Sequence, residues 1–135
     1  MDSVEFIIPG RISGKARPRF TKKGVVYTLA RTASDESVVR HFASQAMRGR
    51  KLLEGPLSLT IEINIKTPAS WSKKRKAAAF HVVGRPDLDN VIKLIGDALN
   101  GIVWRDDSQI SHIDIARYYN APERISVCVG VRALP

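Results

Sequence analysis

The chain has 135 residues, of which 44% are hydrophobic, which is enough for one ordinary core but too short for two independent domains. We therefore expect a single domain over residues 1–135. No apolar stretch approaches the roughly 20 residues needed to cross a bilayer, and the N-terminus has no charged-then-apolar signal pattern, so we expect a soluble protein of the cytoplasm. The single cysteine, Cys128, excludes an internal disulfide framework and a multi-thiolate zinc site.

The charge is strongly basic and unevenly distributed. Twenty-two Lys and Arg residues against thirteen Asp and Glu residues give a formal net charge of +9 and a calculated pI near 10.1, which predicts a polyanionic partner. No acidic residue lies between Glu62 and Asp87. Five acidic residues then fall within twenty-one positions, where they would repel phosphate unless something neutralised them: Asp87, Asp89, Asp97, Asp106 and Asp107.

The first half of the chain predicts two strands and a helix. Residues 4–8 form a short apolar run that ends at Pro9 and Gly10, which is typical of a strand. Residues 24–29 are β-branched and aromatic, so they predict a second strand that forms a hairpin with the first across a charged tip. Hydrophobic residues then recur at helical spacing over residues 34–53, with acidic residues in the expected first turn and basic residues in the last.

The second half mixes strands and helices without a regular βαβ repeat. Residues 57–65 alternate strictly between apolar and polar, and residues 125–131 alternate as cleanly. The other predicted elements are a short basic helix at residues 72–80, a helix at 89–100 that ends at Gly101, and a strand at 110–119. This order predicts an α+β fold: a single-domain two-layer α/β sandwich, with a mixed sheet and helices on one face.

The acidic segment has a spacing that suits metal binding. Pro86 keeps the preceding residue extended, so Asp87 and Asp89 can point the same way from an extended segment just before a helix and share one cation. Hard oxygen ligands without an accompanying His or Cys favour Mg²⁺ or Mn²⁺ over zinc. A bound cation would make the acidic patch attract phosphate and would activate a water, so the predicted reaction is metal-assisted phosphodiester hydrolysis.

Two further parts of the segment belong to the candidate site. Lys93 lies four residues after Asp89 on the same helical face, where it can add positive charge to the transition state or hold Asp89 in place. A turn after the helix is predicted to reverse the chain into a short strand at residues 102–104. Because the chain reverses there, Asp106 or Asp107 can lie beside Asp87 and Asp89. Spacing alone does not decide whether Asp106 or Asp107 does so.

Structural roles compete with these assignments. Either aspartate of the first pair can simply cap the following helix, and Lys93 can be a solvated residue that pairs with Asp89 and Asp97. Asp97 is assigned to structure. Trp104 is favoured as a core residue over a base-stacking platform, and Asp106-Asp107 can form an ordinary turn.

The run from Arg85 to Ile110 resembles the signature of the RusA family of Holliday-junction resolvases. In that signature an Asp-Leu-Asp-Asn segment is followed by a Lys, an Asp-Ala-Leu and a Trp-x-Asp-Asp-x-Gln, and all of these parts are present here in the same order. The resemblance implies that Asp87, Asp89 and Asp107 bind the divalent metal and act in catalysis with Lys93, the functionally required lysine. It also implies that Asp106 is secondary.

The resemblance extends to basic segments and implies DNA as the partner. Lys15-Ala-Arg-Pro-Arg19 is similar to the Lys-x-Arg-Pro-Arg of one branch of the family, and Trp71-Ser-Lys-Lys is similar to a basic stretch that precedes the acidic block there. These segments should contact the phosphates of branched DNA such as four-way junctions. The predicted DNA-binding residues are Lys15, Arg17, Arg19, Lys73, Lys74 and Lys76.

The family resemblance also implies a homodimer, which suits a four-way junction because paired nicks on opposed strands need two sites related by a two-fold axis. The predicted function is Mg²⁺-dependent resolution of Holliday junctions in DNA recombination and repair in a bacterial cell. Because RusA-like proteins are often carried by phages and prophages, a phage setting is expected as well. Two alternatives are a flap or D-loop endonuclease of the same fold and a basic nucleic-acid-binding module without catalysis. The acidic cluster argues against the second alternative.

Overall fold

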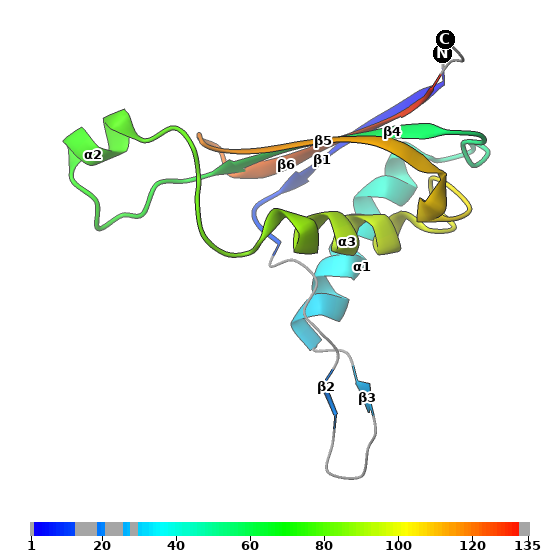
Figure 1. Cartoon of the computed structure of the whole chain (residues 1–135), viewed down its shortest axis with the longest axis horizontal. Helices are drawn as coiled ribbons and strands as arrows, with labels where there is room; N and C mark the ends of the chain where they lie inside the picture. Colours follow the sequence, from blue (N-terminus) through cyan, green and yellow to red (C-terminus); the bar gives the residue numbers. More distant parts are fainter. Residues whose placement is uncertain (1, 13–18, 21–25, 28–29, 133–135) are drawn as a thin grey trace.

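The computed structural model describes residues 2–12, 19–20, 26–27 and 30–132 (Figure 1). Helices and strands are mixed along these residues, which confirms the predicted α+β class. None of the helices in the described part of the chain is long and apolar enough to cross a membrane. In chain order the elements are β1 (Ser3–Pro9), β2 (Arg19–Phe20), β3 (Val26–Tyr27), α1 (Ala30–Ala46), β4 (Leu57–Ile65), α2 (Lys73–Ala78), α3 (Leu88–Leu99), the 3₁₀ turn η1 (Asp107–Gln109), β5 (Ile110–Tyr119) and β6 (Arg124–Val131).

Four strands form one mixed sheet in the order β1-β6-β4-β5. β6 lies inside the sheet and pairs antiparallel with both β1 and β4, whereas β4 and β5 are parallel. Antiparallel neighbours can be joined by a short turn, but a parallel pair needs a long crossover. The crossover from β4 to β5 contains α2, α3 and η1, so the whole acidic segment lies in this one connection.

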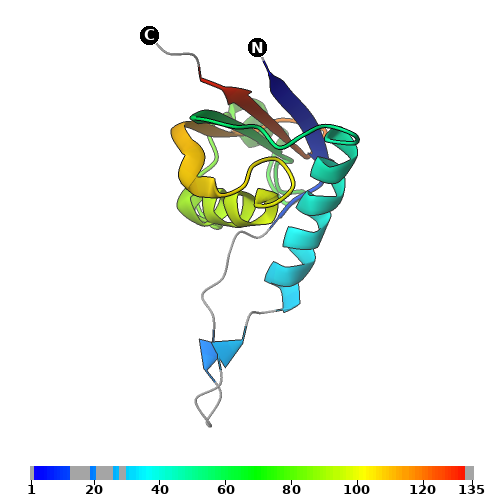
Figure 2. The same ribbon diagram turned by 90° about the vertical axis from the view of Figure 1, so that its right-hand side faces the viewer.

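One side of the sheet is apolar because its strands alternate. Leu57, Leu59 and Ile61 of β4 are buried, and β6 buries every second residue in the same way. In Figures 1 and 2 both α1 and α3 lie below the sheet, and α1 contacts α3 and β1. The residues that α3 adds to the core are Val91, Leu94, Ile95, Ala98 and Leu99.

The pairing of the first strands differs from the prediction. β1 pairs with β6, the last strand of the described chain, and not with the second predicted strand. That strand contributes β3, whose partner is β2, and residues 21–25 between them lie outside the described residues. The alternating burial of Val4, Phe6 and Ile8 explains the difference, because β1 can bury these side chains only as part of the large sheet.

The helix α1 differs from the prediction at both ends. It runs from Ala30 to Ala46 and not over residues 34–53, so the charged residues expected in its terminal turns lie elsewhere. The chain leaves the helix before Gly49, which adopts a positive φ of 72° that helical residues do not take. Leaving the helix lets Leu53 become buried and donate its N–H to the carbonyl of Val103.

The chain after α3 forms a turn with isolated bridges, and not the predicted strand at residues 102–104. Gly101, at a φ of 80°, donates its N–H to the carbonyl of Trp104 and closes the turn. Trp104 is fully buried, and its indole N–H donates to the side-chain oxygen of Asn100 at 2.7 Å. The prediction that Trp104 is a core residue is confirmed.

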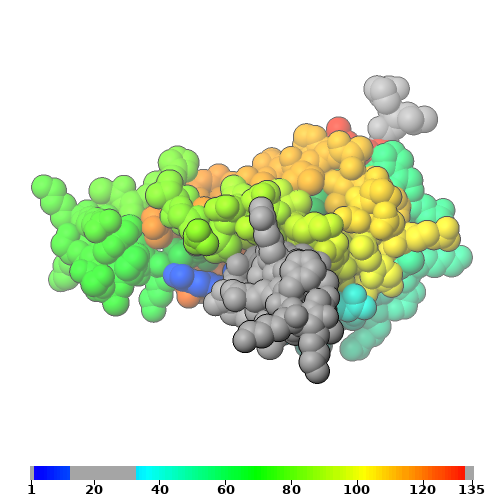
Figure 3. All heavy atoms as spheres, turned by 60° about the horizontal axis from the view of Figure 1, so that its bottom comes forward, coloured from blue at the N-terminus to red at the C-terminus, as the bar shows by residue number. Residues whose placement is uncertain are grey.

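The segment of residues 66–81, which we call the arm, carries the helix α2 away from the sheet (Figures 1 and 3). Ser72 caps its first turn by accepting a hydrogen bond from the N–H of Arg75, and none of the residues of α2 is buried. The chain after α2 returns to the end of β5, where Tyr119 donates its N–H to the carbonyl of Phe80. The arm is therefore attached at its base and open to solvent at its tip.

Candidate nuclease site

Asp87 and Asp89 stand at the start of α3, where both are exposed. Asp87 occupies the N-cap position, and its backbone carbonyl accepts hydrogen bonds from the N–H groups of Asn90 and Val91. Its side chain makes no capping hydrogen bond. Asp87 thus occupies the cap position that the alternative predicts, but its exposed carboxylate does not act as the cap.

A guanidinium group fixes the loop that precedes Asp87. Arg117, in β5, is half-buried and donates from Nη1 to the carbonyl of Pro86 at 2.5 Å and from Nη2 to the carbonyl of Gly84 at 2.9 Å. Its Nε is buried without a hydrogen-bond partner in the described part of the chain. One planar group thus binds two carbonyls of the same loop, which determines where the chain enters α3.

Lys93 lies one turn further along α3 and pairs with Asp97, with an Nζ to Oδ1 distance of 3.4 Å. This pairing with Asp97 is one that the sequence predicts. The Lys93 side chain is 60% exposed, and exposed pairs of this spacing contribute only about 0.3–0.5 kcal/mol. A phosphate group can therefore replace Asp97 as the partner of Lys93 with little loss of stability.

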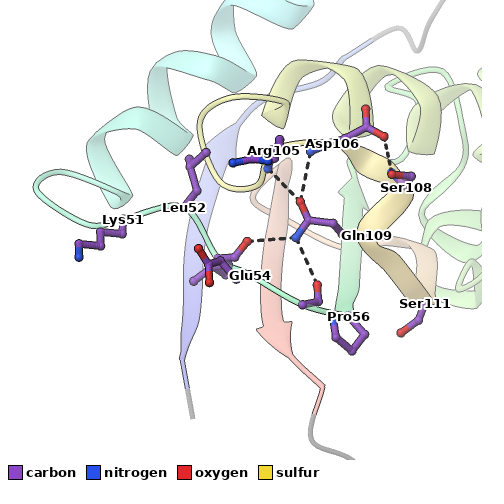
Figure 4. A pocket seen from close by; sticks show the side chains of 11 residues that line it. Lys51, Leu52, Glu54, Pro56, Arg105, Asp106, Ser108, Gln109 and Ser111 are labelled. Carbon is purple, nitrogen blue, oxygen red and sulfur yellow. Dashed lines mark hydrogen bonds between the residues drawn. The ribbon is translucent and has the colours of Figure 1, made fainter.

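Gln109 holds the turn around Asp106 (Figure 4). Its Oε1 accepts from the N–H groups of Arg105 and Asp106, at 3.0 and 3.2 Å. Its Nε2 donates to the carbonyls of Leu53 and Gly55, at 3.1 and 3.2 Å. Every hydrogen-bonding position of the amide is used, so the turn after α3 is attached to the segment before β4.

The two adjacent aspartates have different surroundings. Asp106 caps η1, and hydrogen bonds from the side chain and the backbone N–H of Ser108 hold the pKa of its carboxyl below the ordinary value. Asp107 is half-buried and lies against α3, because a Cβ placed on Gly96 would meet its Oδ2 at 3.5 Å. Asp107 is therefore the member of the pair that packs against α3, a choice that spacing alone left open.

Asp89, Lys93 and Gly96, against which Asp107 packs, are spaced along one side of α3, and Asp87 precedes the helix. Gly96, beside Asp107, follows Asp89 by seven residues, which is close to two helical turns and about 10 Å along the axis. Among the described residues, no three His, Cys, Asp or Glu side chains form a group that could hold a metal ion. The carboxylates thus form a row beside Lys93 and not a closed cage.

A groove of about 690 Å³ lies next to this row, at the turn that Gln109 holds (Figure 4). Its walls are residues 51–56 and five residues of the turn and the start of β5: Arg105, Asp106, Ser108, Gln109 and Ser111. Asp87, Asp89 and Asp107 are not among its lining residues. We therefore assign this groove to the attachment of the turn and not to the reacting groups.

The predicted DNA-binding residues fall on two segments. Lys15 and Arg17 lie outside the described residues, and Arg19 belongs to β2 with its side chain outside the described set. The other three predicted residues lie on the arm: Lys73 and Lys74 are exposed, and Lys76 is half-buried.

Sequence reasoning missed two residues that hold the site. The Trp-x-Asp-Asp-x-Gln signature contains Gln109 but does not indicate its role, and Arg117 lies outside the signature. A signal for Arg117 is present in the strand pattern, because Ile113 and Ile115 share the side of β5 on which Arg117 follows them. A charged residue that continues an apolar row needs a nearby partner, and here the partners are carbonyls of the loop before Asp87.

The comparison with known proteins agrees with the motifs. The family model of endodeoxyribonuclease RusA matches residues 9–130, a range that includes β4, β5, α3, the turn with Asp107 and all but the last residue of β6, but only Pro9 of β1. The chain is also similar to the "Uncharacterized protein YqaN" of Bacillus subtilis (strain 168), at 30% identity over 138 residues, with 96% of each chain covered. The chain belongs to the RusA family of endodeoxyribonucleases, as its motifs predict.

Proposed function

We propose that the protein is a Mg²⁺-dependent endodeoxyribonuclease that resolves four-way DNA junctions by paired phosphodiester hydrolysis. The observation that supports this most directly is the row of carboxylates beside Lys93 on α3, in a chain of net charge +9 that belongs to an endodeoxyribonuclease family. We propose Asp87, Asp89 and Asp107 as the ligands of Mg²⁺, or of Mn²⁺ in its place.

The chemistry of these side chains suits a hard divalent cation. All three offer carboxylate oxygens, and Asp87 makes no capping hydrogen bond that would compete with a metal. Mg²⁺ is commonly bound by one or two carboxylates, with waters and substrate phosphate completing its shell, so a closed cage of protein ligands is not required. When bound, the cation would activate a water and stabilise negative charge on the attacked phosphate.

The remaining groups then act on the DNA. The exposed Lys93 exchanges its half-buried partner Asp97 for a phosphate oxygen and adds positive charge where negative charge develops. Arg117 and Gln109 hold the loops that present Asp87 and Asp107. The basic residues of α2 and of residues 15–19 bind the phosphates of the junction arms.

The proposal includes a homodimer of two-layer α/β sandwiches. A four-way junction has two-fold symmetry, and paired nicks require two active sites related by a matching axis. We place this activity in the bacterial cytoplasm, in the recombination and repair of host, phage or prophage DNA.

Cleavage of a synthetic four-way junction, with linear duplex and flap controls of equal length, tests the proposal in Mg²⁺ and in EDTA. We expect paired, symmetric nicks that need Mg²⁺ and are confined to the junction. Preferential cutting of the flap would instead indicate a branched-DNA endonuclease of relaxed selectivity. Binding without cutting in any divalent cation would indicate a non-catalytic binding module.

Asp89→Asn should lower junction cleavage by at least about 100-fold, because it removes a charged metal ligand. Junction binding in EDTA should stay equal or become tighter, because the substitution also removes repulsion toward phosphate. Asp114→Asn is the matched control, since it removes the same charge from an exposed position of β5. Cleavage by Asp89→Asn at the wild-type rate would refute the assigned site.

A further inference from the structure

The arm ends in a cluster of aromatic rings at the end of β5. The Phe80 ring lies 4.7 Å from the His81 ring and 5.1 Å from the Tyr118 ring, measured between centroids. Phe80 is nevertheless 60% exposed. Most of the stabilisation that full burial of a Phe side chain provides is therefore absent at this position.

The exposed ring is held in place by its surroundings. Its backbone carbonyl accepts the N–H of Tyr119 at 2.8 Å, and the N–H of Val82 donates to the carbonyl of Arg117 at 3.4 Å. His81 forms an isolated antiparallel bridge with Tyr118. Phe80 therefore presents a fixed aromatic surface, and a ligand that stacks on it loses little conformational entropy of the protein.

The other large ring of the arm is already occupied. Trp71 packs against Tyr119 at 5.3 Å, and the guanidinium carbon of Arg75 lies 3.8 Å from the centroid of the Trp71 ring. Tyr118 and Tyr119 point to opposite faces of β5. Phe80 contacts Tyr118 and Trp71 contacts Tyr119, so the two rings pack on opposite sides of the strand end. Phe80 is the ring of this pair that keeps a free surface.

The charge next to Phe80 identifies the class of ligand. Four consecutive basic residues, residues 73–76, precede it on α2, and no acidic residue lies between Glu62 and Asp87. A fixed aromatic ring beside a run of basic residues is the combination that binds unpaired nucleotides, with the ring stacking on a base and the cations binding its phosphates. A second copy of this basic arm would instead be repelled.

The chain also limits the distance from this ring to the proposed site. Asp87 follows Phe80 by seven positions, so their Cα atoms are at most about 25 Å apart. Since one strand of DNA rises about 3.4 Å per nucleotide, that length corresponds to about seven nucleotides. A base stacked on Phe80 can thus belong to the same branch point as the phosphate that is cut.

We propose that Phe80, supported by Tyr118 and His81, stacks on an unpaired base at the branch point of DNA, while the basic residues of α2 bind the flanking phosphates. The proposal rests on the proposed function only in taking branched DNA as the substrate. It adds a reason for structure selectivity, because bases in continuous duplex are already stacked on their neighbours and offer no free face to Phe80.

The test measures binding in EDTA, so that it does not depend on cleavage. The probes are a four-way junction, an oligo(dT) single strand and a blunt linear duplex of equal length, with 2-aminopurine placed at the branch point as a fluorescent reporter of stacking. Phe80→Ala and Phe80→Leu should weaken binding to the junction and to oligo(dT) about tenfold, with binding to linear duplex unchanged. Phe80→Trp should preserve the affinity and the change in 2-aminopurine fluorescence.

Val83→Ser is the matched control, because Val83 is 84% exposed on the same segment and has no ring. Equal binding of all three probes by Phe80→Leu and the wild type would overturn the proposal. So would conversion of a wild-type dimer to monomers by Phe80→Ala in sedimentation, because the ring would then be a subunit contact. If the wild type binds these probes but never cuts, the proposed function fails while the stacking result stands.

Discussion

At the residue scale, two side chains outside the acidic row hold the two ends of α3. Arg117 binds carbonyls of the loop before Asp87, and Gln109 joins the turn after α3 to the segment before β4. Their partners are backbone groups, which do not titrate. The two loops that carry Asp87 and Asp107 are therefore held by contacts that do not depend on the charge of a partner.

Gln109→Glu should separate the two functions of the Gln109 amide. The carboxylate can still accept from Arg105 and Asp106, but it cannot donate to the carbonyls of Leu53 and Gly55, which it instead repels. We expect the free energy of unfolding to fall by about 2 kcal/mol, measured by urea denaturation, and junction cleavage to fall with it. Ser111→Ala, in the same groove, is the control. Wild-type stability of Gln109→Glu would show that the Nε2 bonds do not hold the turn.

Arg117→Ala should loosen the start of α3. The N–H groups of Asn90 and Val91, which donate to the carbonyl of Asp87, should exchange with solvent at least about tenfold faster. The Mg²⁺ concentration for half-maximal cleavage should rise about tenfold, with recovery at saturating Mg²⁺, because ligand placement and not the ligand itself is lost. Arg117→Lys, which keeps the charge but not the two-pronged geometry, should fall in between.

Arg40 provides the control for this experiment. It also donates to a carbonyl of α3, that of Ala98 at 3.2 Å, but at the opposite end of the helix. Arg40→Ala should therefore affect stability without changing the Mg²⁺ requirement. An Arg117→Ala protein with unaltered exchange at Asn90 and Val91 would contradict the positioning role.

At the element scale, the loop before β6 is joined to β1 and β4 through one carboxylate. Glu123 accepts from Nε of Arg11 and, at 3.2 Å, from the N–H of Lys66, and its carbonyl accepts the N–H of Gly10 at 3.0 Å. Arg11 also donates to the carbonyl of Lys66. The hydrogen bond from Arg11, followed by that from the Lys66 backbone, holds the pKa of Glu123 below its ordinary value.

This depressed pKa predicts a dependence of stability on pH. A carboxyl whose pKa is lower in the folded than in the unfolded chain stabilises the fold above the unfolded value, about 4.3 for Glu, and loses that stabilisation as the pH falls through the folded value. Urea denaturation midpoints should therefore decline from pH 5 to pH 3, and less steeply in Glu123→Gln. Glu62→Gln, at an exposed position of β4, controls for the loss of one carboxylate. Identical slopes for Glu123→Gln and wild type would exclude this linkage.

The elements that the sequence predicts well are those with a strong local period. Residues 57–65 and 110–119 are strands with the predicted bounds, and the helix of the acidic segment is displaced by one residue. The errors concern strand partners, element ends and the strand predicted at residues 102–104, which is a turn. The hairpin partner of the first strand and the end of α1 depend on contacts between distant residues, such as Leu53 with Val103, and a local pattern holds no information about them.

At the scale of the whole molecule, the two faces of the sheet differ in charge. The face opposite the helices presents Glu5, Glu62 and Asp114, all exposed. The basic arm and Lys93 belong to the crossover that contains α2 and α3. A chain of net charge +9 therefore keeps one face unfavourable for phosphate, which agrees with the proposed binding of DNA on the side with the carboxylate row.

The candidate site is a similar mixture of the predictable and the unpredictable. The residue types at Asp87, Asp89, Lys93 and Asp107 indicate metal-assisted chemistry from the sequence alone, because few other roles need so many carboxylates in a basic chain. Their arrangement as a row needs three dimensions, since it depends on how the turn after α3 returns to Gly96. No local sequence pattern predicts the contact between Asp107 and Gly96.

The position of β6 affects how the enzyme is made in the cell. This strand is near the end of the described chain, yet it lies between β1 and β4 inside the sheet. While a ribosome is still synthesising residues 124–131, β1 and β4 have no shared partner, and the core beneath α3 cannot close. The residues that form the row of carboxylates are synthesised before β6, but we expect their arrangement to form only after β6 has joined the sheet. The order of the strands thus predicts that a nascent chain without β6 does not cleave DNA.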